Sequence, residues 1–274
     1  MQVSKSMKFT SFNLKTTRSE TRYTVLTFLF IFLSIVTGIS YVFIKTNKNL
    51  VSITETGNFL IISSCSDDIP YKSLEEALND PLSVCQLSLT GQQLESVPEG
   101  IADLSNLEKL DLHTNQISVL PSEIRNLKKL THLDLGDNKF TALPSEIYNL
   151  TNLEVLELGF NQIDEIPSRI ADLKNLHELA INKNNIYQIP PEIGKLTDLD
   201  VLELSNNKIT VLPSEIGNLT RLTGLHLHDN GLTEFPTKLS NLNKLEVLDL
   251  RNNRFSAEEI NRIKSLFPNV NISI

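Results

Sequence analysis

Leucine, asparagine and proline each recur along residues 81–264 with a constant step of 23 residues. The leucine ladder consists of Leu104, Leu127, Leu150, Leu173, Leu196, Leu219 and Leu242. The asparagine ladder consists of Asn115, Asn138, Asn161, Asn184, Asn207, Asn230 and Asn253. The proline ladder consists of Pro98, Pro121, Pro144, Pro167, Pro190, Pro213 and Pro236. Because three ladders keep one period, residues 81–264 are predicted to form eight repeats.

Each repeat predicts one short strand and a return path around it. The unit reads LxxLxxLxLxxNxIxxLPxxIxx, as in residues 127–149. The two leucines of LxL are two residues apart, so both point to the buried face of a strand. Proline suits the start of a short helix, since its missing N–H would be unpaired there. One unit buries too little alone, so the repeats should stack into a solenoid whose ladder asparagines bond the turn backbone across repeats.

The phrase LPSEIxNL, at residues 120–127, 143–150 and 212–219, resembles leucine-rich repeat proteins of the 23-residue, LP-containing type, the bacterial members above all. The lead-in over residues 73–98 does so too, and the resemblance covers about residues 70–274. It implies an α/β fold. This is a right-handed horseshoe with a parallel β-sheet on its concave face, turns or short helices outside, and binding through the concave face.

The last repeat departs from the pattern and predicts a lid. Ser256 with Glu259 forms a capping box, and Ile263 and Phe267 follow at helical spacing. Residues 256–274 are therefore predicted to be a C-terminal cap helix and tail that lie across the last repeat.

Residues 65–80 are predicted to form the N-terminal cap, in which Ser73 with Glu76 starts a short helix. The only two cysteines, Cys65 and Cys85, lie in and beside this cap. In an oxidising compartment a disulfide between them would join the cap to the first repeat and contribute roughly 3 kcal/mol. The alternative is that Cys85 fills space beside a strand and Cys65 is a free thiol.

Residues 23–44 contain no charged side chain and predict a transmembrane helix. As a helix this run would span roughly 33 Å, which matches the hydrocarbon core of a bilayer. Residues 1–22 carry five basic residues and one acidic residue, so the positive-inside rule places them in the cytoplasm. Residues 45–64 are then a linker, and the repeats lie outside the cytoplasm.

Other fates of this run stay open. Residues 38–40 read Gly-Ile-Ser, the small-x-small pattern of a signal cleavage site, so the mature protein would be secreted or periplasmic. A reversed topology would make it a cytoplasm-facing scaffold. A buried soluble helix has no place to pack against the repeats.

The outward residue between the two core leucines of each strand marks the candidate binding face: Ser88, Asp111, Asp134, Glu157, Ala180, Glu203, His226 and Asp249. Five of these eight are acidic. Neighbouring strands lie about 4.8 Å apart, so Asp111, Asp134 and Glu157 should form a column of like charges. A basic protein partner would relieve their repulsion, whereas the alternative is an ordinary solvated face screened by salt.

Apolar side chains accompany the acidic column. Val155 and Val201 occupy the outward position before the first core leucine of their strands, and Phe160 precedes the ladder Asn161. An exposed aromatic side chain beside acids could anchor a protein partner. It could equally fold back over a neighbouring turn.

His226 and His228 are two residues apart and share the outward face. A lateral row of Glu203, His226 and Asp249 would raise the histidine pKa and make binding sensitive to pH. Two histidines at this spacing are a weak signal for a metal, and we expect no metal or other cofactor there.

The net charge of −8 argues against nucleic acid as a partner. The chain has no phosphate-binding loop, zinc-ligand set or nucleophile motif, so we do not expect an enzyme. The expected function is that of a membrane-anchored leucine-rich repeat protein that binds another protein through its concave face. The alternative is an adhesive or structural protein, secreted or of the cell envelope.

Overall fold

The computed structural model describes residues 28–32, 41–45, 50–53, 59–62 and 70–274. The chain divides into two units, Met1–Ile62 and Ser63–Ile274, and each has its own sheet. The predicted basic segment 1–22 lies outside the described residues, as do parts of the predicted linker.

The described residues of the first unit form a four-stranded antiparallel sheet. Its strands are β1 (Phe28–Phe32), β2 (Tyr41–Lys45), β3 (Leu50–Ile53) and β4 (Phe59–Ile62), paired in that order. Strands β1 and β2 thus lie within or overlap residues 23–44, where the sequence predicts a single helix. A continuous apolar run has no alternation of polar and apolar residues that would distinguish a helix from strands. Its aromatic and β-branched residues favour strands. No helix among the described residues is long and apolar enough to cross a bilayer.

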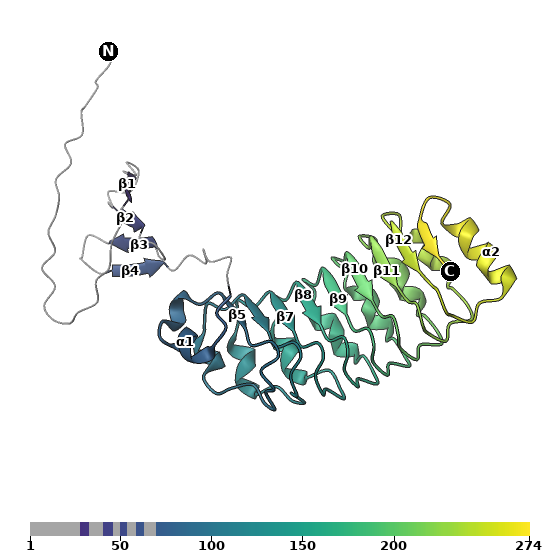
Figure 1. Ribbon diagram of the computed structural model, residues 1–274. Helices are drawn as coiled ribbons and strands as arrows, with labels where there is room; N and C mark the ends of the chain where they lie inside the picture. The colour runs from purple at the N-terminus through teal and green to yellow at the C-terminus, as the bar shows by residue number, and fades with distance from the viewer. Residues whose placement is uncertain (1–27, 33–40, 46–49, 54–58, 63–69) are drawn as a thin grey trace, which may run out of the picture. The chain divides into compact units, whose positions relative to one another are not determined.

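The second unit is a solenoid built on a nine-stranded parallel sheet, which confirms the predicted repeat fold (Figure 1). Its strands follow one another in chain order: β5 (Gln86–Ser88), β6 (Lys109–Asp111), β7 (His132–Asp134), β8 (Val155–Glu157), β9 (Glu178–Ala180), β10 (Val201–Glu203), β11 (Gly224–His226), β12 (Val247–Asp249) and β13 (Asn271–Ser273). Pairing is in register, so Leu110 lies beside Leu133 and Leu133 beside Leu156. The leucines of LxL are buried, as their spacing predicts.

Short 3-10 helices form the return path on the opposite side of the repeats. They are η2 (Ile101–Asp103), η3 (Ser122–Asn126), η4 (Ser145–Asn149), η5 (Ser168–Asp172), η6 (Pro191–Lys195), η7 (Ser214–Asn218) and η8 (Thr237–Asn241). From η3 to η8 the ladder proline is the residue just before the helix, with an extended backbone. Successive helices pack closely: a Cβ on Gly217 would lie 2.4 Å from the carbonyl oxygen of Lys238.

The asparagine ladder joins each repeat to the one before it, as predicted. The amide of Asn161 donates to the carbonyl oxygens of Leu135, Leu158 and Gly159 at 3.0, 3.1 and 3.2 Å. Its Oδ1 accepts the backbone N–H of Phe140 at 3.0 Å. This side chain therefore satisfies buried backbone groups of two repeats at once.

The N-terminal cap covers the first strand. Tyr71 forms a parallel bridge to Leu87 of β5, and the short helix α1 (Leu74–Leu78) follows. As the capping box predicts, Ser73 accepts the backbone N–H of Glu76 at 3.4 Å. Gln92 stands where later repeats have the ladder asparagine, and its amide donates to the carbonyl oxygen of Lys72 in the cap.

Cys85 is buried beside this cap and is disulfide-bonded. Cys65 is the one other cysteine in the sequence and lies outside the described residues. The pair of Cys65 with Cys85 therefore stays a prediction.

The C-terminal cap begins with helix α2 (Ala257–Leu266), whose N-cap Ser256 accepts the backbone N–H of Glu259 at 3.1 Å. The carboxylate of Glu259 serves the preceding repeat, where it accepts the N–H of Phe235 at 2.7 Å. Arg262 donates to the carbonyl oxygen of Phe235 and pairs with Glu259. These two side chains thus bond the backbone N–H and carbonyl groups of Phe235 at the end of the array.

Apolar contacts complete this cap. The rings of Phe235 and Phe267 meet edge to face, with centroids 5.9 Å apart and planes at 85°. Strand β13 then adds a ninth strand beside β12, an element that the sequence pattern does not predict. Helix α2 thus packs against the last repeat, at the place where the sequence predicts a lid.

The asparagine ladder can be tested by removing one side chain. Asn161→Ala leaves a buried N–H and several carbonyl groups without their partner, so the free energy of unfolding should fall by about 1–3 kcal/mol. Urea denaturation measures this. Gln162→Ala changes an exposed amide in the adjacent position and should alter stability by less than about 0.5 kcal/mol. Equal losses in the two variants would contradict a structural role for the ladder.

Candidate functional site

The parallel sheet turns one face to the core and the other away from it; we call the second the open sheet face. Three rows of side chains define it, with one residue of each repeat in every row. The first row is Gln86, Lys109, His132, Val155, Glu178, Val201, Gly224 and Val247. The second is Ser88, Asp111, Asp134, Glu157, Ala180, Glu203, His226 and Asp249, and the third, two residues further on, is Thr90, His113, Gly136, Gly159, Asn182, Ser205, His228 and Arg251.

Register brings the predicted acidic column together. Asp111 pairs with Asp134 across β6 and β7, and Asp134 pairs with Glu157 across β7 and β8. The three carboxylates nevertheless have different surroundings, because the third row supplies different donors to each.

The carboxylate of Asp111 is surrounded by hydrogen-bond donors of the protein. It accepts hydrogen bonds from the hydroxyls of Thr90 and Ser88 at 2.6 and 2.9 Å, and from the backbone N–H of His113 at 2.9 Å. Burial alone would raise the pKa of Asp111, but these hydrogen bonds outweigh it and hold the pKa below its usual value. This carboxylate is stable as an anion without any partner.

Asp134 is only partly compensated. It accepts the N–H of Gly136 at 2.8 Å, and His113 Nδ1 lies 3.4 Å from its Oδ1. Burial and the neighbouring charge of Asp111 raise the pKa of Asp134 despite these contacts.

Glu157 stands at the end of the column without compensation. Within residues 70–274 it accepts no hydrogen bond and forms no ion pair. Partial burial raises the pKa of Glu157, and the charges of Asp134 and Glu178 raise it further. On its other side the second row continues with Ala180, which carries no charge. Glu157 is therefore the carboxylate that a bound cation would stabilise most.

Apolar groups surround this carboxylate. Val155 and Val201 of the first row are half-buried. Phe160, at the end of the β8 turn, is 47% exposed and has a left-handed backbone with φ 56°. The ammonium of Lys183 lies 4.0 Å from the centre of the Phe160 ring, a cation–π contact with the next repeat. The exposed ring is thus held in place by a side chain of the next repeat.

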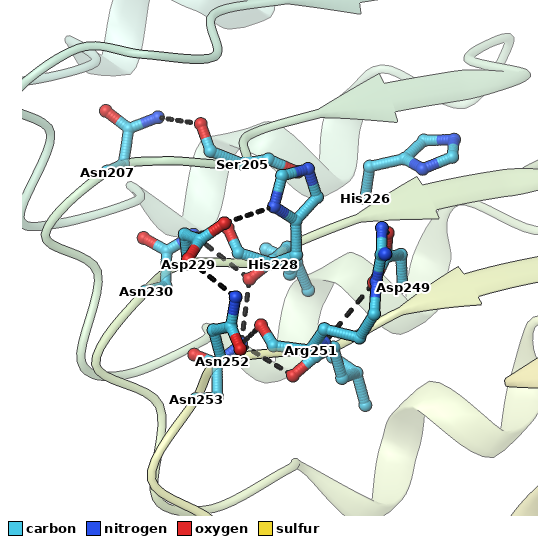
Figure 2. Close-up of polar contacts among 12 residues, drawn as sticks. Ser205, Asn207, His226, His228, Asp229, Asn230, Asp249, Arg251, Asn252 and Asn253 are labelled. Atoms are coloured by element: carbon cyan, nitrogen blue, oxygen red, sulfur yellow. Dashed lines mark hydrogen bonds and ion pairs between the residues drawn. The ribbon is translucent and has the colours of Figure 1, made fainter. Parts of the chain in front are cut away.

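The C-terminal part of the open sheet face pairs its own charges (Figure 2). Arg251 donates to Asp249 with its Nε at 2.9 Å and also with a terminal nitrogen. His228 Nδ1 lies 2.7 Å from Asp229, which also accepts the amide of Asn252. The carboxylates of Asp249 and Asp229 therefore have polar partners within the chain and do not require a binding partner.

The predicted row of Glu203, His226 and Asp249 forms only in part. His226 Nδ1 lies 4.0 Å from Glu203, whereas Asp249 turns to Arg251 (Figure 2). A bidentate guanidinium is the stronger partner for a carboxylate, so it takes Asp249 from the histidine. Arg251 belongs to the third row and lies two residues after Asp249 in the sequence. This spacing could have identified Arg251 as a partner of Asp249.

Ser205, His228 and Asp229 lie near one another in the same region (Figure 2). The Ser205 side chain is buried at 1% exposure, and its hydroxyl has no hydrogen-bond partner among the described residues. A hydrolytic triad requires a hydroxyl bonded to the histidine and open to substrate, so this set lacks that geometry. In the described part of the chain, no group of three His, Cys, Asp or Glu side chains could hold a metal ion.

Three family models of leucine-rich repeats match the chain. A leucine-rich repeat region matches residues 178–267, a leucine-rich repeat model matches residues 83–140, and a two-copy model matches residues 128–171. No curated protein sequence matches the chain.

Solved structures of leucine-rich repeat proteins are similar to this chain. Internalin C2 of Listeria monocytogenes is 31% identical with a TM-score of 0.63, over 72% of this chain and 81% of that one. A leucine-rich repeat protein of Leptospira interrogans is 33% identical with a TM-score of 0.55, over 70% and 61%. The Arabidopsis receptor kinase HAESA, solved with a peptide hormone and a co-receptor, is 31% identical with a TM-score of 0.58, over 63% and 30%. The chain thus spans less than two thirds of the Leptospira and Arabidopsis chains.

The uncompensated charge of Glu157 has a consequence for stability. Its pKa is raised on folding, so the folded protein loses stability as pH rises from the usual value of 4.5 through the raised pKa. Glu157→Gln stays neutral, and it should therefore melt higher than the natural chain at pH 7 and equally with it below pH 4.5. Thermal unfolding at both pH values measures this.

Asp111→Asn is the matched contrast. The pKa of Asp111 is lowered on folding, so its stabilising effect is present above 3.8 and is lost as pH falls through the lowered pKa. This variant should melt lower than the natural chain at pH 7. Should both variants shift in the same direction, the assignment of Glu157 as the uncompensated carboxylate is wrong.

Proposed function

This chain belongs to the leucine-rich repeat family, and from that premise we propose that it binds a protein or peptide partner on its open sheet face. The proposed role is that of a binding scaffold rather than an enzyme. A parallel sheet of nine strands presents its three rows as a continuous surface, and solenoids of this kind use such extended surfaces for recognition.

The observation that carries the proposal is the contrast along the second row. Asp249 is paired with Arg251 and Asp111 is satisfied by three donors, whereas Glu157 has a raised pKa and no partner among the described residues. Glu157 is exposed, so a side chain of a partner can reach its carboxylate. An uncompensated carboxylate beside an exposed aromatic ring is the arrangement expected where a partner completes the contacts.

The chemistry of the partner follows from these groups. A lysine or arginine side chain of the partner would lie among Asp134, Glu157 and Glu178, and an apolar side chain would contact Val155 or Phe160. The same carboxylates would repel the phosphates of a nucleic acid. HAESA, whose structure is similar to this chain, was solved in complex with a peptide hormone, and this supports a peptide or protein as the partner.

Charge reversal at the centre of the site tests the proposal. Partners are captured on the immobilised full chain, identified by mass spectrometry, and measured by surface plasmon resonance. Glu157→Lys should slow association with the partner at least about tenfold, and more at low salt than at high salt. The reason is that the variant places a cation where the partner brings one.

Glu123→Lys is the control for that experiment. Glu123 is exposed on η3, away from the open sheet face, and its reversal changes the net charge by the same amount. Its affinity should stay near that of the natural chain. Equal losses in both variants would show a general charge effect and reject the open sheet face as the site.

We propose in addition that residues 23–44 anchor the chain in a membrane, with residues 1–22 in the cytoplasm. The support is the sequence alone: an uncharged run of 22 residues, preceded by most of the nearby cations. The chain should stay with membranes after an alkaline carbonate wash, and protease added to intact cells should digest the repeats. Release by carbonate would indicate a secreted form, and protection from protease would indicate a reversed topology.

A further inference from the structure

A second exposed feature lies away from the open sheet face, just before the ladder proline of each repeat. Two hollows of about 400 and 480 Å³ adjoin there and share Thr210 and Val211 in their walls. We call the pair the edge groove. The first is walled by Tyr187, Ile189, Pro191 and Pro213, and the second by Phe235, Pro236 and Glu234, among others.

The edge groove carries exposed apolar side chains at positions that are polar in several other repeats. Val211 is 71% exposed and Tyr187 is 54% exposed. Residues at the repeat position of Val211 include Glu165, Gln188 and Glu234, so the repeat pattern does not require an apolar side chain here. Burying such a side chain under a partner would remove apolar surface from water, which favours binding.

One wall of the edge groove is held rigidly by the C-terminal cap. Arg262 donates to Glu259, to the carbonyl oxygen of Phe235 and to the hydroxyl of Thr237. Glu259 in turn accepts the N–H of Phe235 at 2.7 Å. The charges of Arg262 and Glu259 are thereby paired with each other. This wall of the edge groove is therefore already formed in the absence of a partner.

Glu234 gives the edge groove its free charge. Within residues 70–274 its carboxylate accepts no hydrogen bond and forms no ion pair, and it lies close enough to Arg262 to help raise the pKa of that guanidinium. The groove therefore runs over three successive repeats from Tyr187, through Val211, to an acidic end at Glu234.

We propose that the edge groove binds an extended peptide segment of a partner protein, with an aliphatic side chain between Tyr187 and Val211 and a lysine or arginine at Glu234. An extended segment sends alternate side chains to one side about 6.6–6.8 Å apart, so it can place both groups in adjoining hollows. The exposed apolar side chains supply the affinity, and the one unpaired carboxylate orients the segment. This site is independent of the open sheet face.

A peptide library tests the edge groove. Random twelve-residue peptides displayed on phage are selected on the full chain, and the enriched sequences are synthesised and measured by fluorescence anisotropy. Sequences with an aliphatic residue near lysine or arginine should be enriched. Val211→Ser should weaken their binding about tenfold, and Glu234→Gln should weaken it severalfold, with less effect at high salt.

Two controls separate this site from other surfaces. Val119→Ser removes a valine that is 66% exposed at the equivalent repeat position but does not line either hollow, so it should leave binding unchanged. Glu157→Lys should also leave it unchanged if the edge groove is distinct from the open sheet face. Both Val211 and Glu234 are at the surface, so thermal unfolding should confirm that their variants fold.

The proposal is overturned if no such sequences are enriched, or if those enriched bind Val211→Ser as well as the natural chain. It is also overturned if Val211→Ser converts a dimer to a monomer in sedimentation. In that case the occupant of the edge groove is a second copy of this chain.

Discussion

The solenoid depends on one contact, the ladder asparagine that joins the backbone of each repeat to that of the repeat before it. Asn161 satisfies carbonyl groups on both sides of a repeat boundary, and six other asparagines do the same at 23-residue steps. A single repeat has too little core to be stable alone, so the array depends on the contacts between neighbouring repeats. At the two ends of the array, Gln92 donates to the carbonyl oxygen of Lys72 in the N-terminal cap, and Glu259 and Arg262 bond the backbone of Phe235.

The same regularity that builds the sheet also creates its electrostatic problem. Parallel strands in register place equal repeat positions side by side, so acidic residues at one position must become neighbours. The donors within reach of each carboxylate differ. His113 of the preceding repeat lies 3.4 Å from Asp134, and Arg251 donates to Asp249, whereas Gly159, two residues after Glu157, and Gly136 of the preceding repeat have no side chain. The proposed binding site thus lies at an exception within a regular array.

Sequence patterns predicted the repeats, the buried leucines, the asparagine ladder and both caps, because each rests on spacing that backbone geometry translates directly. They did not predict the strands at Phe28–Phe32 and Tyr41–Lys45, since a continuous apolar run carries no periodicity to separate strand from helix. The row of Glu203, His226 and Asp249 was predicted from register alone. The row forms only in part because the side chain of Arg251 is bonded to Asp249, which leaves His226 beside Glu203 alone.

By itself the sequence determined which residues face the core and which become neighbours on the open sheet face, because a constant step of 23 residues sets both the strands and their register. Only the tertiary structure decided which of the neighbouring carboxylates remains uncompensated, since that depends on the donors within reach of each one. It also decided that Tyr187, Val211 and Glu234 share a groove with the C-terminal cap. The walls of this groove come from three repeats and the C-terminal helix, and no local sequence pattern links these parts.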